Sequence, residues 1–145
     1  MDNFITITDY DASIHREILD SLVREDTTCD SAVVEICEDR AIEEMRSYLY
    51  KFYDCDAIFN ARGKDRHPLI LMMALDIAIY HLFSLHNPYK ISDIRKERYE
   101  RACAWLKAVS KAEVVIDGAP RRDAEETAAG SAWTMDSDTH RETHL

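Results

Sequence analysis

Glycine and proline are scarce in this sequence, at three residues each in a chain of 145. Antiparallel sandwiches and barrels need several tight chain reversals, and these two residue types supply much of the backbone geometry of such turns. Their scarcity argues against an all-β fold and favours an all-α one. The length gives room for one domain with a modest hydrophobic core.

Patterns typical of disulfides and metal sites are also missing. Four cysteines occur, at positions 29, 37, 55 and 103, and none belongs to a Cys-x-x-Cys pair. Their spacing matches no zinc ribbon or zinc finger. We therefore expect reduced, mostly buried thiols in an intracellular protein, with no metal and no cofactor. The N-terminal residues lack the basic and apolar segments of a secretory signal.

Catalytic signatures are absent from the sequence as well. It contains no glycine-rich phosphate loop, no Gly-x-Ser-x-Gly turn, no His-Glu-x-x-His and no Glu-x-x-His. These absences exclude the metal-dependent, nucleotide-binding and hydrolase motifs that can be recognised from one sequence. We expect no enzymatic activity. The alternative is a small helical enzyme that uses Asp76 with His81 as its acid and base.

Acidic residues outnumber basic ones. Asp and Glu total 28 and Lys and Arg total 18, which gives a net charge of −10. A protein that coats nucleic acid needs clustered positive charge, so this balance argues against that class. A second alternative is an acidic helical module that binds a basic protein partner.

The spacing of the apolar residues predicts four helices arranged as a bundle. Their ranges, in order, are about 9–24, 30–52, 68–85 and 92–111. Residues suited to the start of a helix stand at each beginning, namely Asp9 or Asp11, Asp30, Pro68, and Ser92 or Asp93.

The segments between and around these helices are predicted to be extended or irregular. Residues 1–8 are predicted to form an extended lead-in, residues 53–66 a loop, and residues 113–117 a possible short strand. We place the helical domain at 1–118. Residues 119–145 are polar and poor in large apolar groups, which is typical of an extended or disordered tail.

The third predicted helix is apolar on nearly all sides. Residues 69–85 include a single charged residue, Asp76, near the middle. A charge at that depth is costly in a bilayer, so a central helix covered by its neighbours is favoured over a membrane span. We expect Asp76 and Tyr80 to be buried polar residues that fix the register of this helix, with a basic residue of the fourth helix reaching Asp76.

The second and fourth predicted helices carry charge of opposite sign. Opposite charges on two exposed faces allow identical subunits to meet head to tail and close a ring. The acidic candidates for such an interface are Glu35, Glu38, Asp39 and Glu43. The basic candidates are Arg95, Lys96, Arg98 and Arg101. In the tail, the candidates for binding a partner are Arg121, Arg122, Trp133 and Met135.

Two stretches resemble a known family. They are HPLILMMALDIAIYHLF at 67–83 and IRKERYERACAWLKAVSKAEVVIDG at 94–118. Over about residues 4–118, these stretches and the order of the helices around them resemble the head–tail adaptor proteins of tailed phages, in the branch found in Mu-like phages and prophages. The loop at 53–66 lacks the proline of the family pattern, so no surface contacts are transferred to it.

The resemblance implies a structural role without catalysis. Such adaptors are helical bundles that form a ring, commonly of twelve subunits, docked on the portal protein. The ring extends the channel through which DNA passes without specific binding, and it joins the head to the next neck or tail component. The implied location is the portal vertex of the virion, after assembly in the host cytoplasm and without a membrane.

Overall fold

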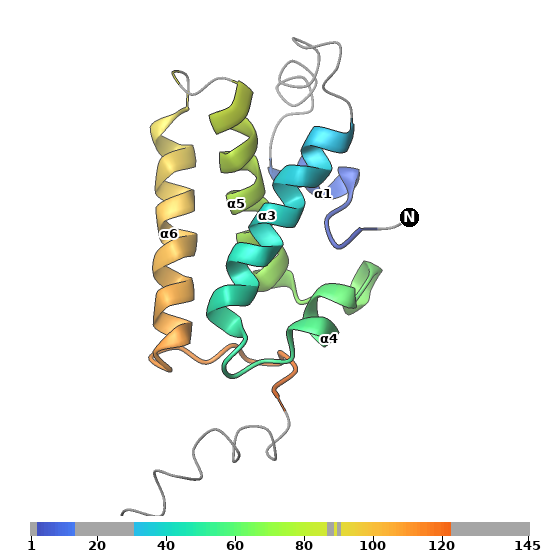
Figure 1. Ribbon diagram of the computed structural model, residues 1–145, viewed down its shortest axis with the longest axis vertical. Helices are drawn as coiled ribbons and strands as arrows, with labels where there is room; N and C mark the ends of the chain where they lie inside the picture. The colour runs from blue at the N-terminus through green and yellow to red at the C-terminus, as the bar shows by residue number, and fades with distance from the viewer. Residues whose placement is uncertain (1–2, 14–30, 87–88, 90, 123–145) are drawn as a thin grey trace, which may run out of the picture.

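Three long helices form the body of the protein in the computed structural model, which describes residues 3–13, 31–86, 89 and 91–122 (Figure 1). The elements are α1 (Ile7–Ser13), α3 (Ser31–Leu49), α4 (Cys55–Asn60), the 3₁₀ turn η1 (Gly63–Asp65), α5 (Pro68–His86) and α6 (Asp93–Ser110). Helices α3, α5 and α6 all pack on one another, while α1 lies on α5 and α4 on α3. The all-α prediction agrees with this structure. A four-helix bundle stays a prediction, because most of the expected first helix lies outside the described residues.

Helix α3 buries one stripe of its surface. Cys37, Ala41, Met45 and Leu49 follow one another at steps of four residues, and each is at most 1% exposed. This spacing places them on the face that packs against α5 and α6. The helix was predicted to reach residue 52, but it ends at Leu49, because the chain turns there and buries the Tyr53 ring. The predicted cap Asp30 lies outside the described residues.

Helix α5 occupies the centre of the body. It begins at Pro68 as predicted, where the missing proline N–H removes no helical hydrogen bond. Ile70, Ala74, Ile77 and Ile79 have no exposed surface. The helix is long and apolar enough to cross a membrane by length and composition, and half of residues 68–85 are buried inside the protein. Packing by α3 and α6 covers much of this apolar helix.

Helix α6 has well-defined ends. The side chain of Ser92 accepts a hydrogen bond from the backbone N–H of Arg95 at 3.3 Å, which confirms the predicted cap. After Lys111 the chain enters a left-handed turn at Ala112, whose φ is 60°. The N–H of Glu113 then bonds to the carbonyl of Ala108 at 2.9 Å. This closing bond is typical of helix C-termini that end with glycine.

The beginning of α1 differs from the prediction. The helix starts at Ile7, so Asp9 is its third residue and Thr6 its N-cap. The Asp9 carboxylate accepts hydrogen bonds from the Thr6 N–H at 2.7 Å and from the Thr6 hydroxyl at 2.8 Å. The bond from the Thr6 N–H is one half of a capping box. It uses the Asp9 carboxylate from within the helix, so Asp9 does not serve as the N-cap. Phe4 and Ile5 in the lead-in are buried, and residues 14–24 of the predicted helix lie outside the described residues.

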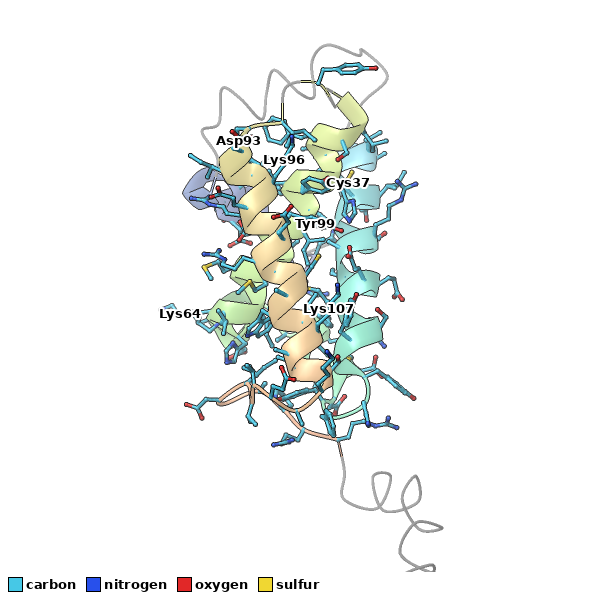
Figure 2. All side chains as sticks on the ribbon, turned by 90° about the vertical axis from the view of Figure 1, so that its left-hand side faces the viewer. Cys37, Lys64, Asp93, Lys96, Tyr99 and Lys107 are labelled. Carbon is cyan, nitrogen blue, oxygen red and sulfur yellow. The ribbon has the colours of Figure 1, made fainter. Side chains whose placement is uncertain are left out.

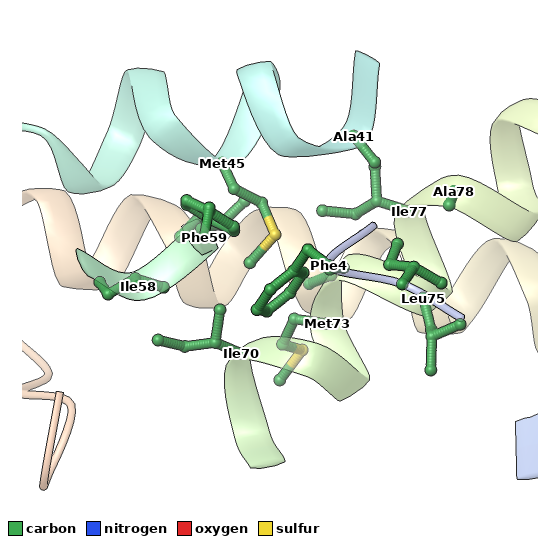
Figure 3. Packing of buried hydrophobic residues seen from close by; sticks show 14 of the residues in the cluster. Phe4, Ala41, Met45, Ile58, Phe59, Ile70, Met73, Leu75, Ile77 and Ala78 are labelled. Atoms are coloured by element: carbon green, nitrogen blue, oxygen red, sulfur yellow. The ribbon is translucent and has the colours of Figure 1, made fainter. Parts of the chain in front are cut away.

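The predicted loop at 53–66 contains two short helical elements, α4 and η1, which corrects that prediction. The Asp54 side chain caps α4 by accepting a hydrogen bond from the Ala57 N–H at 3.1 Å. Six residues are too few to show a helical period in the sequence. The Phe59 ring meets the Phe4 ring at 5.1 Å, and Figure 3 shows Phe4 among core residues of α3, α4 and α5.

The possible strand at 113–117 is also wrong. The part of the chain that the structure describes contains no strand, and its single isolated bridge pairs Tyr53 with Arg121. Val115 is 60% exposed, whereas Ile116 is buried and its N–H donates to the Tyr53 hydroxyl at 2.8 Å. The apolar run at 114–116 is therefore irregular chain that buries one side chain, Ile116, because the described residues provide no strand with which it could pair.

Candidate interaction surfaces

The outer surface of α3 is acidic. Glu35, Asp39 and Glu43 are all exposed, and Ile36 lies among them with 47% of its surface exposed. These four residues are called the acidic face below. Successive residues turn by about 100° around a helix, so the four occupy a single arc of its surface. The acidic face agrees with the charge pattern in the sequence, except at Glu38.

Glu38 was expected on this exposed face, and the structure buries it. It is 6% exposed and accepts a 2.7 Å hydrogen bond from the Tyr10 hydroxyl of α1. Burial raises the pKa of Glu38 to about 7, against the opposing effect of the bond from Tyr10, while Asp39 and Glu35 add repulsion. The sequence could not reveal this burial, because the covering residue comes from a separate helix.

The four predicted basic residues of α6 do not form one face. Lys96 is exposed on α6, and Figure 2 shows it in line with Tyr99 and Lys107 along the helix. Arg98 and Arg101 lie together on another edge, beside α5. Arg95 is half-buried. Residues at 96 and 101 are separated by about 140° around the helix, so the basic charge is divided between two edges.

A groove runs over α5 between α1 and α6. It has a volume of about 470 Å³ and is called the α5 groove below. Its lining consists of Asp9 from α1, of Pro68, Leu71, Met72, Leu75 and Asp76 from α5, and of Arg98 and Arg101 from α6. Its floor is thus mainly apolar, and one wall carries two guanidinium groups.

Asp76 lies at the base of the α5 groove, paired with Arg101. The Arg101 Nη2 and Asp76 Oδ2 atoms are 3.0 Å apart, and the two side chains are 54% and 4% exposed. A basic residue of α6 therefore reaches this buried carboxylate and compensates its charge. Arg101, a candidate for binding a neighbouring subunit, thus also makes an internal ion pair, and its role at a subunit interface stays a prediction.

Tyr80 was expected to be buried with Asp76 and is only half-buried. Its ring stacks on the Tyr99 ring, with centroids 4.0 Å apart and planes 8° apart. The stack joins α5 to α6, and the Tyr99 hydroxyl donates onward to Glu44 of α3. Tyr80 thus contributes through its ring, one helical turn beyond Asp76.

Glu44 is the polar centre of the interface between the three long helices. It accepts hydrogen bonds from the Tyr99 hydroxyl at 3.1 Å and from the Cys103 thiol at 3.8 Å, and it contacts His81 Nε2 at 3.1 Å. Burial raises the pKa of the Cys103 thiol, which keeps that thiol protonated at neutral pH. From the sequence, Glu44 is indistinguishable from the exposed acids beside it.

The structure does not combine Asp76 and His81 into the acid–base pair that the enzyme alternative requires. Asp76 pairs with α6 through Arg101, and His81 pairs with α3 through Glu44, so each has a separate partner. The Glu44 carboxylate also lies between the imidazole and the thiol, whereas a catalytic triad places the imidazole in the middle. Within the described ranges, no group of three or more His, Cys, Asp or Glu side chains could hold a metal ion.

Residues 119–122 are attached to the body, while the predicted boundary between domain and tail at residue 118 stays a prediction. The carbonyl of Pro120 accepts from the Asp54 N–H at 3.0 Å, and the Arg122 N–H donates to the Phe52 carbonyl at 3.2 Å. The Arg122 guanidinium also lies 4.3 Å from the Tyr50 ring centroid. The turn after α3 exposes backbone groups there that residues 119–122 satisfy.

The sequence matches the protein family described as Bacteriophage Mu, Gp36 over residues 4–135. That match spans most of the chain. The chain belongs to this family. It is accordingly a Mu-like phage protein of the structural or morphogenesis class, associated with the phage or its virion. No curated protein and no solved structure matches it.

The Mu Gp36 match also reaches further along the chain than the resemblance seen in the sequence, which ended at about residue 118. It includes the docked residues 119–122 and continues to Met135. Trp133 and Met135 therefore belong to the family region of the chain, although both lie outside the described residues. The segment after Gly118 is part of what the family shares.

Proposed function

We propose that this Mu-like phage protein is a head-to-tail adaptor. In this role about twelve copies form a ring on the portal protein, extend the DNA channel and join the head to the next neck or tail component. The family supports a phage structural role. The observation that carries the ring is the presence, on one subunit, of an acidic face on α3 and of a groove with a basic wall between α5 and α6.

Closed rings need two different surfaces on each subunit. A head-to-tail contact uses one surface of a subunit and the complementary surface of the next, and it closes when the rotation between subunits divides a full turn. The carboxylates of the acidic face and the guanidinium groups of the groove provide such a pair. A two-fold dimer built on either surface alone would instead place like charges opposite each other.

Net charge supports the passage of DNA. The chain carries a net charge of −10, so a ring of many copies is strongly acidic. Positive charge along a channel binds phosphates and retards a moving duplex, whereas negative charge prevents such adhesion. The proposal accordingly assigns DNA to the channel as a passing polymer without a specific binding site, and it contains no catalytic step.

The lower end of the body in Figure 1 is the proposed exit of the partner-binding tail. Residues 119–122 are fixed there by backbone hydrogen bonds to Phe52 and Asp54. We assign contact with the portal or a neighbouring subunit to the segment that contains Trp133. Tryptophan is enriched among the residues that dominate binding energy at protein interfaces.

Native mass spectrometry tests the proposal directly. The chain is measured alone and after mixing with the portal protein encoded by the same phage genome, at low and at moderate salt. The expected result is a portal complex that carries about 200 kDa of added mass, from about twelve copies of 16.8 kDa. Failure to bind the portal at either salt concentration contradicts the adaptor role. A complex of one or two copies with a basic protein would support the acidic binding module instead.

A further inference from the structure

We infer that the acidic face of α3 on one copy of this chain docks into the α5 groove of the next copy. This inference rests on the proposed ring and names its subunit contact. It concerns Glu35, Ile36 and Asp39 on one side, and the apolar floor of the groove with Arg98 on the other.

The two surfaces lie on opposite sides of the subunit. His81 of α5 contacts Glu44 of α3, whereas Met72 of α5 lines the groove. These two α5 residues are nine positions apart, which corresponds to about 180° around a helix. The acidic face lies on the outside of α3, so it points away from the groove of its own chain. One chain therefore cannot satisfy both surfaces by itself.

The groove offers an apolar floor beside an uncompensated positive charge. Met72 is 40% exposed, and Leu71 beside it is only partly covered. Arg98 makes no ion pair or hydrogen bond with any residue in the described ranges. The other charged groups of the groove are already occupied, because Asp9 bonds to Arg66 at 2.6 Å and Asp76 bonds to Arg101.

The acidic face offers the complementary groups. Ile36 presents an exposed aliphatic side chain on α3. Glu35 and Asp39 lie beside it, on the same side of the helix, and are one helical turn apart. Burying Ile36 against Met72 removes apolar surface of both from water, while the neighbouring carboxylates reach the Arg98 side of the groove. Apolarity and charge thus favour the same pairing.

A second copy of the chain is the occupant that this arrangement favours. Both halves of the contact are present in every copy and face opposite directions, so each docking event leaves one face and one groove open. Such a contact adds copies in sequence until the ring closes. A partner of another kind would occupy one surface and leave the other unused.

Charge reversal tests the pairing. One variant combines Glu35→Lys with Asp39→Lys, and the other carries Arg98→Glu. Each alone is expected to weaken every subunit contact about tenfold or more and to abolish the ring on the portal, measured by native mass spectrometry. An equimolar mixture of the two variants is expected to restore a ring with alternating subunits, because each acidic surface again meets a basic one. All three substitutions in one chain should also restore it.

Matched controls separate this contact from general charge effects. Lys64→Glu and Glu113→Lys reverse exposed charges outside both surfaces and should leave the ring intact. Rings formed by the wild type and equally by both variants would overturn the inferred contact and leave the adaptor role standing. A mixture that fails to restore the ring also overturns it, since direct pairing is then absent.

One further outcome is diagnostic. If the wild-type chain does not bind the portal, the proposed function fails and the inferred contact fails with it. Far-ultraviolet circular dichroism confirms that each variant retains its helices before assembly is measured.

Discussion

The Tyr10 hydroxyl donates a 2.7 Å hydrogen bond to the Glu38 carboxylate and thereby ties α1 to α3. Both residues are buried, at 3% and 6% exposure. The contact places an ionisable group under α1, at the point where the N-terminal helix meets the three-helix body. Its protonation therefore affects how firmly α1 is held.

We predict that stability falls as pH rises through the titration of Glu38. Burial raises the pKa of Glu38 to about 7 from the ordinary value of 4.5, so the folded state binds this proton more tightly than the unfolded state. The contribution of the protonated Glu38 to the free energy of unfolding is complete below pH 4.5 and is lost as the pH rises from 4.5 to about 7. Urea unfolding between pH 4.5 and 8 should show Glu38→Gln gaining about 1 to 3 kcal/mol relative to wild type at the upper end.

Tyr10→Phe is the matched control for that titration. This substitution removes the Tyr10 hydroxyl and with it the hydrogen bond that favours the ionised carboxylate. The pKa of Glu38 should therefore rise further, and the loss of stability should extend to higher pH. If the difference between wild type and Glu38→Gln is the same at every pH, Glu38 does not titrate in this range.

Asp76 and Arg101 are predicted to be energetically coupled. Arg101→Met removes the cation that bonds to the buried Asp76 carboxylate and should lower the free energy of unfolding by about 2 kcal/mol. The loss is smaller than for a fully buried pair because Arg101 is half-exposed and Arg95 also interacts electrostatically with Asp76. Adding Asp76→Asn removes the unpaired charge and should recover much of that loss. A double-mutant cycle from chemical denaturation measures the coupling, and additive effects of the two substitutions would contradict it.

Ala112→Gly is predicted to stabilise the protein. Ala112 has a φ of 60°, a left-handed conformation that strains residues with a Cβ atom and suits glycine. Relief of that strain exceeds the added freedom of glycine in the unfolded chain, so the expected gain is about 0.5 to 1 kcal/mol. Thermal unfolding should show a higher Tm. Ala104→Gly is the control, because this exposed position inside α6 should lose a similar amount.

Two truncations are predicted to separate folding from partner binding. Ending the chain after Arg122 preserves the hydrogen bonds to Phe52 and Asp54, so thermal stability should not change while portal binding is lost. Ending it after Gly118 removes those bonds as well and should cost about 1 to 2 kcal/mol. Differential scanning calorimetry measures the thermal stability of both truncated chains, and pull-down with the portal measures their binding. Unchanged portal binding by the longer truncation would refute the role of the tail.

Three kinds of local information were sufficient for much of the fold. The apolar spacing in α3 and α6 located those helices, and Pro68 and Ser92 marked the beginnings of α5 and α6 because their backbone and side-chain chemistry acts within a few residues. The scarcity of glycine and proline was sufficient to favour helices over sheets. The short helix α4 was not predicted, because its six residues complete less than two helical turns and show no period in the sequence.

The sequence by itself determined the sign of the charge on each helix, the positions of the long helices and the presence of one carboxylate in an apolar segment. Only the tertiary structure decided which charges remain available. It buried Glu38 beneath Tyr10, paired Asp76 with Arg101, gathered His81 and Tyr99 around Glu44, and left Arg98 at the edge of the α5 groove. The physical reason is that helical periodicity states which residues share a face. The identity of the covering group depends on contacts between residues tens of positions apart, which no local pattern encodes.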